Sequence, residues 1–366
     1  MLDDTYAHSP LNKMFDQSDV YGVGYDDERA SRKRIRLGLI GAGGVAQSKH
    51  IPAIMRLKTI WEPVDLAAIS SLDERTGRRL EQTYGCRWYG DSAAMLSQET
   101  LDGVLVTSPD GLHAEHGIAC LEAGLPVMVE KPLCRSLRDS QRLCRLADER
   151  GLVLMTVSNK RYSPPYRRAK RFVDEGPVAN PAMFCGKFNL GYDDVDLFES
   201  GTVHLFDLTR FFMGNVRSVH AVGVNHYQRN RTGYPIDNAI ITFEFTSSAI
   251  GTLYTTSTAL SLKPWERVEI YGNNGWLAVE DQFELILYDS EEGPAKSWRP
   301  VIPNTLIFDE EFGGYMGEIE NFLQAIRGAE RPLVTGWDGH HALELCLASH
   351  RSIQRRETVD LPLDEG

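Results

Sequence analysis

The sequence of 366 residues predicts an α/β protein in two parts: a doubly wound parallel sheet in residues 34–158 and an α+β domain with a largely antiparallel open sheet in residues 159–366. Two observations predict this fold class. In the first part, short apolar runs alternate with helical segments, which is the spacing of βαβ units. In the second part, one strand pattern follows another. Residues 1–33 have no regular period, and we expect an irregular arm there.

Hydrophobic periodicity places the elements of the first part. Buried strands are expected at residues 35–40, 64–69, 103–107, 126–129 and 152–157. Helices are expected at residues 46–57, 73–84, 113–123 and 136–150. Because strand and helix alternate at this spacing, the strands should form one parallel, doubly wound sheet.

The second part changes to strands after two helices, at residues 165–175 and 204–213. The expected strands are 218–225, 239–245, 249–256, 266–271, 276–280 and 285–288. Asn273, Asn274 and Gly275 tolerate positive φ and predict a hairpin turn between two of them. The chain then closes with helices at 316–327 and 339–351.

The predicted antiparallel sheet has no helical segment left to cover its second face. An uncovered sheet face is a liability for a protein that stays monomeric. We therefore expect this face to pack on another copy of the chain, as a homodimer, a homotetramer or a higher oligomer.

Composition excludes several classes of protein. The chain has 51 acidic against 39 basic residues, a net charge of −12, whereas a nucleic-acid binder needs a basic face. No uncharged stretch of about 20 apolar residues is present, so no membrane span is expected. The basic residues 32–36 and the apolar run 37–46 imitate a signal peptide, but a long acidic segment precedes them and the run contains four glycines. Six scattered cysteines without a C-x-x-C pair indicate reduced thiols and a cytoplasmic protein.

A glycine motif lies between the first strand and the first helix. Gly41, Gly43 and Ala46 form the pattern G-x-G-x-x-A. The first allows a tight turn, the second lets the backbone approach a pyrophosphate, and the alanine keeps the helix close to the sheet. The amino end of that helix then holds the negative charge. The motif predicts a Rossmann dinucleotide-binding domain, with cofactor contacts from Gly41, Gly43, Gly44, Val45 and Ala46.

The end of the second strand bears on the choice between NAD and NADP. An NAD site usually places an acid here, and an NADP site usually places an arginine nearby. Ser70 and Ser71 occupy this point, and the first basic residue downstream is Arg75. The sequence favours NAD without excluding NADP, and Ser70 is expected to contact the cofactor.

Two segments at strand ends carry a family resemblance. Residues 108–113 read Ser-Pro-Asp-Gly-Leu-His, and residues 130–132 read Glu-Lys-Pro. Further matching segments are 123–124, 159–162, 201–214, 265–267 and 332–335. Together they resemble the glucose–fructose oxidoreductase, inositol dehydrogenase and MocA family from about residue 34 to the end. The resemblance implies a Rossmann domain, an α/β domain with an open sheet, and oxidation or reduction of a sugar or cyclitol carbon with NAD or NADP.

The same resemblance implies two catalytic residues. Oxidation of a secondary alcohol sends hydride to the nicotinamide while a base removes the hydroxyl proton. A cation beside the oxygen favours the developing alkoxide. By resemblance, Lys131 supplies the cation and His204 accepts the proton.

This chain departs from the family near His204. Many members carry an aspartate four residues before this histidine, where Ser200 stands here. Glu199 and Asp207 are the nearby acids that could support His204. Three outcomes are open: Glu199 acts through a shifted turn, Lys131 and His204 work without an acid, or activity is lost.

The resemblance implies further contacts. Cofactor contacts are expected from Ser108, Pro109, His113 and Glu130, in addition to Lys131. Substrate contacts are expected from Asn159, Arg161, Asn189 and Tyr192. No metal is expected, because histidines three residues apart at 113 and 116 have no third ligand.

The leading hypothesis is an NAD(P)-dependent dehydrogenase that acts on a hydroxyl of a sugar, glycoside or cyclitol, with oxidation at sugar C3 as a refinement. Two alternatives use the same residues. One is a lyase or glycoside-cleaving enzyme that retains its NAD. The other is an inactive sugar or dinucleotide sensor, which would be consistent with Ser200 in place of the aspartate that many members carry.

Overall fold

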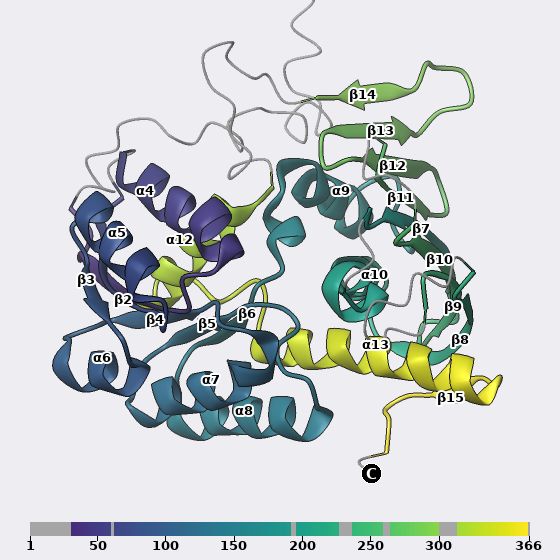
Figure 1. Ribbon diagram of the computed structural model, residues 1–366. Helices are drawn as coiled ribbons and strands as arrows, with labels where there is room; N and C mark the ends of the chain where they lie inside the picture. The colour runs from purple at the N-terminus through teal and green to yellow at the C-terminus, as the bar shows by residue number, and fades with distance from the viewer. Residues whose placement is uncertain are drawn as a thin grey trace, which may run out of the picture. The chain divides into compact units, whose positions relative to one another are not determined.

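The computed structural model describes residues 31–59, 62–191, 195–226, 236–258, 264–299 and 313–364 (Figure 1). They form two compact units. The first contains the described residues of 23–159 and 309–343, and the second those of 160–308 and 344–364. Residues 1–30 of the predicted arm lie outside the described residues, and the limits predicted for the domains stay a prediction.

The first unit is built on a six-stranded parallel sheet. Its order is β3-β2-β1-β4-β5-β6. The strands are β1 (Ile35–Ile40), β2 (Val64–Ser70), β3 (Arg87–Tyr89), β4 (Gly103–Val106), β5 (Val127–Val129) and β6 (Leu154–Thr156). The order reverses between β1 and β4, which makes a crevice at the carboxyl ends of these strands. The predicted doubly wound sheet is confirmed.

Helices cover both faces of this sheet (Figure 1). One face carries α4 (Ile51–Thr59), α5 (Glu74–Tyr84) and α12 (Tyr315–Ile326), and the other carries α6 (Ser92–Gln98), α7 (His113–Glu122) and α8 (Leu137–Arg150). A π-helical segment, η2 (Ala46–His50), precedes α4, and a short turn, η3 (Asp110–Leu112), precedes α7. Leu37, Leu39 and Val104 are fully buried in the sheet, as expected for strands covered on both sides.

The second unit is built on a nine-stranded sheet with the order β14-β13-β12-β11-β7-β10-β9-β8-β15. The strands are β7 (Met183–Asn189), β8 (Val216–Val224), β9 (Asn238–Phe245), β10 (Ile250–Thr256), β11 (Glu266–Tyr271), β12 (Trp276–Glu280), β13 (Glu284–Tyr288), β14 (Lys296–Trp298) and β15 (Val359–Asp360). The pair β7 and β10 is parallel and all other pairs are antiparallel. The largely antiparallel sheet is therefore confirmed.

One face of this sheet is apolar and packed. The helices here are α9 (Pro164–Asp174), α10 (Val203–Met213) and α13 (Gly336–Arg355). A short turn, η4 (Asn159–Tyr162), precedes α9, and a π-helical segment, η5 (Phe198–Thr202), precedes α10. Along β9, Ile241, Phe243 and Phe245 are buried, whereas the alternate residues Ile240 and Thr242 face outward. This period of two is the pattern of a half-covered strand.

The predicted elements miss β3, α6, β7 and the short strands β14 and β15. The strand β7 is central in its sheet, but it contains Gly186 and Lys187, which weaken a strand pattern in the sequence. Both β3 and β14 have only three residues. Among the described helices, none combines the length and apolar character needed to cross a bilayer.

Candidate functional site

The glycine-rich turn follows β1 and brings the backbone close to the end of β4. Gly41 has a φ of +96°, and a Cβ atom there would lie 2.5 Å from the backbone nitrogen of Ser108. The Gly41 N–H donates to the Ser70 carbonyl at 2.8 Å, and the Thr107 hydroxyl donates to the Gly41 carbonyl at 2.5 Å. Any other residue at position 41 would be both strained and obstructed.

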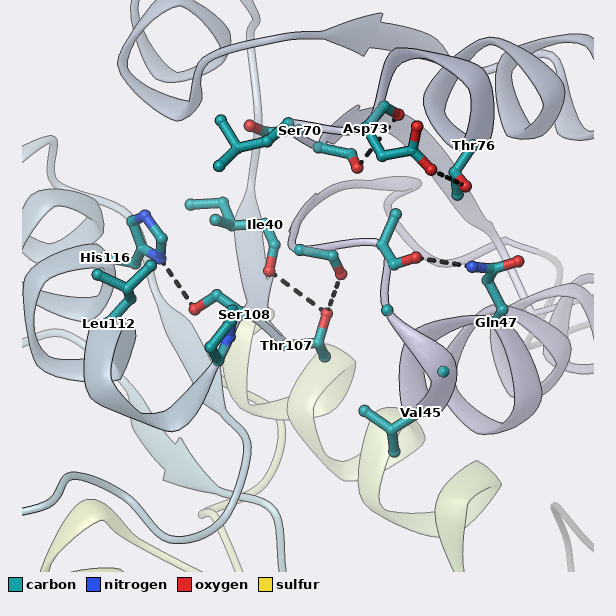
Figure 2. A pocket seen from close by; sticks show the side chains of 17 residues that line it. Ile40, Val45, Gln47, Ser70, Asp73, Thr76, Thr107, Ser108, Leu112 and His116 are labelled. Atoms are coloured by element: carbon teal, nitrogen blue, oxygen red, sulfur yellow. Dashed lines mark hydrogen bonds between the residues drawn. The ribbon is translucent and has the colours of Figure 1, made fainter. Parts of the chain in front are cut away.

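A cavity of about 660 Å³ opens at the carboxyl ends of β1, β2 and β4 (Figure 2). The predicted residues that line it are Gly41, Gly43, Gly44, Val45, Ser70, Ser108 and Pro109. The lining also includes residues that the sequence does not predict at this site: Gln47, Asp73, Thr76, Thr107, Leu112 and His116. The cavity lies at the topological switch point, where open α/β sheets bind their ligands.

The residues present fit a dinucleotide. Cβ atoms built on Gly43 and Gly44 would meet nothing within 4 Å, so the backbone there faces open space at the start of a helix. Ala46 is fully buried beneath it. Free backbone N–H groups beside open space are the cradle that a pyrophosphate requires.

The end of the cavity near β2 carries a negative charge. Asp73 caps α5, accepting from the Arg75 N–H at 3.2 Å and from the Thr76 hydroxyl at 2.5 Å. The hydrogen bond from Thr76 holds the pKa of the Asp73 carboxyl below its usual range. None of the residues that line the described cavity is Lys or Arg. The charge of Arg75 also acts on Asp73, but Arg75 does not line the described cavity, and the carboxylate that does line it disfavours a 2′-phosphate, which agrees with NAD.

Two histidines of α7 have different surroundings. The ring nitrogens of His113 lie 2.8 Å from the carbonyl oxygens of Ser108 and Pro132, so His113 joins the loops that follow β4 and β5. His116 lines the cavity, with Nδ1 2.9 Å from the Ser108 hydroxyl. Burial lowers the pKa of His116. The contact predicted between His113 and the cofactor stays a prediction.

Lys131 directly follows the buried Glu130 at the end of β5. One carboxylate oxygen of Glu130 lies 2.8 Å from Nε2 of His50, and the other accepts from the Lys131 N–H at 2.9 Å. Burial acts to raise the pKa of Glu130, but the hydrogen bond from His50 and the charges of His50 and Lys131 outweigh it and lower the pKa. The carboxylate is therefore ionised and fixed at both oxygens.

His204 lies in the first turn of α10, in the second unit, and a π-turn precedes it. In that turn the Val203 N–H bonds to the carbonyl of Phe198, five residues earlier. Glu199 lies within this π-turn, and Ser200 follows it. π-turns inside helices are frequent at functional sites.

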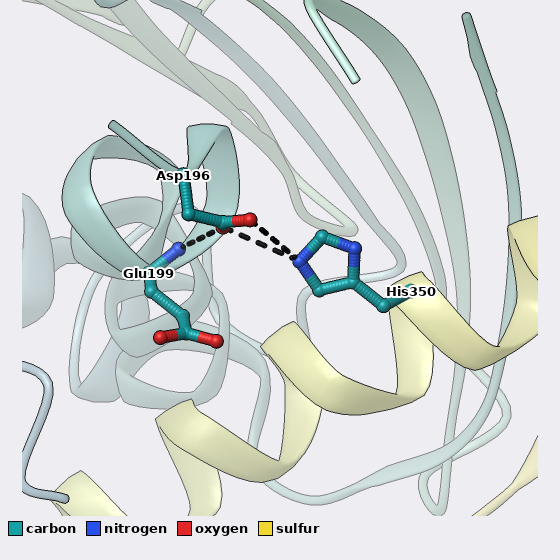
Figure 3. Close-up of side chains that lie close together, drawn as sticks. All are labelled: Asp196, Glu199 and His350. Atoms are coloured by element: carbon teal, nitrogen blue, oxygen red, sulfur yellow. Dashed lines mark hydrogen bonds and ion pairs between the residues drawn. The ribbon is translucent and has the colours of Figure 1, made fainter. Parts of the chain in front are cut away.

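The amino end of the helix that carries Glu199 and His204 is held by Asp196 and His350 (Figure 3). Asp196 Oδ1 accepts from the N–H groups of Phe198 and Glu199 at 2.8 and 2.9 Å, and His350 Nε2 lies 3.1 Å from Oδ2. Burial acts to raise the pKa of Asp196, but His350 and the two amides outweigh it and lower the pKa. Ligand atoms of Asp196, Glu199 and His350 lie within 4.8 Å of one another, and the bonds from Asp196 to the two amides are those of a helix cap.

The predicted substrate residues differ in their contacts. Arg161 and Asp207 form a buried fork, with Nε to Oδ2 at 2.8 Å and Nη2 to Oδ1 at 2.6 Å. The Asn159 amide donates to the Gly313 carbonyl at 2.6 Å, and Asn189 ends β7. Tyr192 lies outside the described residues.

Two other resembling segments are joined inside the second unit. The Lys160 ammonium pairs with the Glu266 carboxylate, whose other oxygen accepts from the Tyr166 hydroxyl at 2.6 Å. Lys160 also lies 4.5 Å from the ring centre of Trp265. Lys160, Tyr166 and Glu266 are buried, whereas Trp265 is partly exposed. The packing of this cluster therefore accounts for the two segments 159–162 and 265–267 that carry the resemblance.

The structure thus gathers the predicted residues in two groups. The glycine turn, Ser70, Ser108 and Pro109 line one cavity of the first unit. Lys131 follows β5 in the same unit and is not among the residues that line this cavity. His204, Glu199, Asp207 and Arg161 belong to the second unit.

The fold and the cavity define a protein that binds a dinucleotide in a Rossmann domain. A family model described as an oxidoreductase family with an NAD-binding Rossmann fold matches residues 35–158, and the model of its C-terminal α/β domain matches residues 199–361. The chain belongs to this glucose–fructose oxidoreductase, inositol dehydrogenase and MocA family, and NAD is its cofactor.

Curated relatives span nearly the whole chain. A myo-inositol 2-dehydrogenase from Thermotoga maritima is 27% identical, over 89% of this chain and 98% of its own length. An NAD⁺-dependent scyllo-inositol 2-dehydrogenase from Bacillus subtilis is 26% identical, over 75% of this chain and 82% of its own. A levoglucosan dehydrogenase solved with NADH and levoglucosan is 20% identical with a TM-score of 0.81, covering 90% of this chain and all of its own, which shows the fold.

Gly43→Ala should abolish NADH binding without destabilising the protein, because the new methyl group meets no protein atom and enters the space beside the backbone amides. Gly41→Ala is the matched variant: it should lower both binding and the melting temperature, because its Cβ atom meets the Ser108 backbone. NADH fluorescence titration and thermal denaturation measure the two effects. Full NADH affinity in Gly43→Ala would contradict this assignment of the cavity.

His116→Asn should make the folded protein less sensitive to acid. The pKa of His116 in the fold lies below its usual value of 6.5, so between the two values the unfolded chain binds more protons. Above pH 6.5, His116 therefore has no unfavourable effect on the free energy of unfolding. As the pH falls from 6.5 toward the lower pKa of the folded state, His116 destabilises the fold increasingly. The drop in melting temperature between about pH 7.5 and pH 5.5 should be smaller in the variant than in wild type or in His220→Asn, which changes an exposed histidine. Equal drops would show that His116 does not contribute.

Proposed function

We propose that this protein is an NAD-dependent dehydrogenase that oxidises a secondary hydroxyl of a sugar, glycoside or cyclitol. The observation that carries the proposal is the position of Lys131. It follows β5, in the sheet whose β1, β2 and β4 ends line the NAD cavity. Catalytic side chains of open α/β sheets lie at this edge. The names of the relatives support the substrate class, since two are inositol dehydrogenases and one acts on levoglucosan.

In the proposed mechanism, Lys131 and His204 handle the hydroxyl of the substrate. The glycine turn at Gly41, Gly43 and Gly44 would hold NAD⁺, which would supply the acceptor for a hydride from the carbinol carbon. The Lys131 ammonium donates a hydrogen bond to the substrate oxygen and stabilises its developing negative charge. A ring nitrogen of His204 takes the hydroxyl proton, so a carbonyl remains on the substrate. In the reverse direction, His204 returns the proton.

Glu199 is the acidic partner that we propose for His204. In an α-helix, Ser200 would occupy the stacked position four residues before His204. The π-turn over Phe198–Thr202 adds one residue to this turn, and an added residue would bring position 199, rather than position 200, over position 204. This geometry supports Glu199 as the residue that orients the His204 ring. Asp207 is held by Arg161 at both oxygens, and we propose that this pair supports α10.

We further propose that two copies of the chain pack through the outer face of the nine-stranded sheet. Val222, Ile240 and Tyr254 are neighbours across β8, β9 and β10, and each is at least half exposed. Val224 and Ile250 extend this outer patch on the same strands, and both are also at least half exposed. A contiguous apolar patch on a sheet face is typical of a subunit interface.

Lys131→Met and His204→Asn should each lower kcat by about 10²–10⁴-fold, because each removes an interaction with the reacting hydroxyl. NADH affinity should change little in His204→Asn, and His226→Asn, at an exposed position after the end of β8, is the matched control. Reduction of NAD⁺ is followed by absorbance with inositols, levoglucosan and apiose as substrates. Full activity in either variant contradicts its role. Turnover without release of NADH would favour the lyase or glycoside-cleaving alternative, and no turnover by wild type on any polyol would favour the sensor.

Ile240→Glu combined with Tyr254→Glu should convert the oligomer to a monomer, because two buried charges would face each other across the interface. Light scattering coupled to size-exclusion chromatography measures the mass. Leu333→Glu, at an exposed apolar position of the first unit, should leave the mass unchanged. A wild-type protein that is already monomeric would disprove the interface.

A further inference from the structure

His50, a fully buried histidine shortly after the glycine turn, has no part in the mechanism above. His50 ends the π-helical segment Ala46–His50 and has no exposed surface. The Ile51 N–H bonds to the Ala46 carbonyl, five residues earlier. Pro52 follows and cannot donate to the carbonyl of Ser48, so the ordinary α-helical ladder is interrupted here. The π-helical segment that follows the glycine turn therefore places the His50 side chain in the protein interior.

Among the residues that the structure describes, His50 makes one polar side-chain contact, with Glu130, which is in turn bonded to Lys131. Its Nε2 lies 2.8 Å from Glu130 Oε1, while Glu130 Oε2 accepts from the Lys131 N–H at 2.9 Å. The other ring nitrogen, Nδ1, is buried and has no hydrogen-bond partner within the described ranges of the chain, and the ring meets Tyr315 edge to face at 5.6 Å. A buried polar atom without a partner costs stability, so losing the bond at Nε2 as well would add a second such cost. The bond to Glu130 therefore holds the ring in its position.

The Glu130 carboxylate needs His50 to stay where it is. A buried carboxylate retains its charge only when its oxygens are hydrogen-bonded or paired. The backbone of Glu130 is tied to β4 through its N–H, which donates to the Val106 carbonyl at 2.9 Å. With His50 in place, the carboxylate turns back onto the next amide and fixes the backbone from which the Lys131 side chain departs.

We propose that His50 is a positioning residue for Lys131, acting through the Glu130 carboxylate. The activity of Lys131 belongs to the proposed function, so this inference rests on it. The requirement is a hydrogen-bond donor at the position of His50 Nε2. Side chains that present such a donor should preserve the orientation of Lys131, and side chains that lack it should not.

The test compares two amides at one position. His50→Gln carries an N–H donor at about the reach of the imidazole, whereas His50→Asn is one methylene shorter and cannot reach Glu130. In His50→Asn, kcat should fall by about 10–100-fold with little change in the KM for NAD⁺, because a misplaced catalytic group costs rate and the cofactor cradle is intact. His50→Gln should stay close to wild type.

A second readout needs neither cofactor nor substrate. Hydrogen exchange at the Lys131 amide, measured by mass spectrometry with residue-level fragmentation, reports the bond to Glu130 directly. The exchange should quicken by about fivefold in His50→Asn, the equivalent of one lost hydrogen bond of about 1 kcal/mol, and not in His50→Gln. If wild type oxidises no alcohol, the proposed function fails while this readout still tests the link from His50 to Lys131.

Three results would overturn the inference: wild-type kcat and exchange in His50→Asn, equal impairment of the folded Gln and Asn variants, or a loss of kcat with unchanged exchange. His50→Leu replaces His50→Asn if the latter does not fold, since it also lacks a donor and suits a buried position. If neither folds, His50→Gln decides: slow exchange at Lys131 supports the inference and fast exchange overturns it.

Discussion

The close approach of the Gly41 backbone to the end of β4 is the constraint on which the candidate site depends. A methyl group at position 41 would lie 2.5 Å from the Ser108 nitrogen, so only glycine permits the turn. The turn starts the next helix at the carboxyl edge of the sheet and leaves Gly43 and Gly44 facing open space. This edge of the sheet carries the cavity, the residues at the end of β4 and the strand end that Lys131 follows.

The described part of the chain contains two π-turns, one in each unit. The first, over Ala46–His50, takes the chain from the phosphate cradle to the buried partner of Glu130. The second, over Phe198–Thr202, lies between the Asp196 cap and His204. In both, an added residue changes which side chains stack within the helix. The turn geometry therefore bears directly on which residues serve the proposed chemistry.

Much of the fold and of the cofactor site could be predicted, because their signals are local. The glycine motif, the buried strand runs and the Glu-Lys-Pro segment are each contiguous in the sequence. No sequence pattern predicts the contact of His50 with Glu130, the place of Asp73 in the cavity lining or the contact of His116 with Ser108. These contacts arise only from folding. Likewise β7 owes its place to pairing with β10 and β11 rather than to its own pattern. The role proposed for Glu199 in place of Ser200 depends on a π-turn, and a π-turn has no plain signature in the sequence.

The central claim is that this protein transfers a hydride from a carbinol carbon to NAD⁺. The most direct test is to incubate it with NAD⁺ and with inositols and anhydrosugars deuterated at their carbinol carbons, and to determine the mass of the nicotinamide product. The account predicts that each reduced cofactor carries one deuterium and that one equivalent of ketone forms with it. Reduced cofactor without deuterium, or no reduction with any of these alcohols, would contradict it.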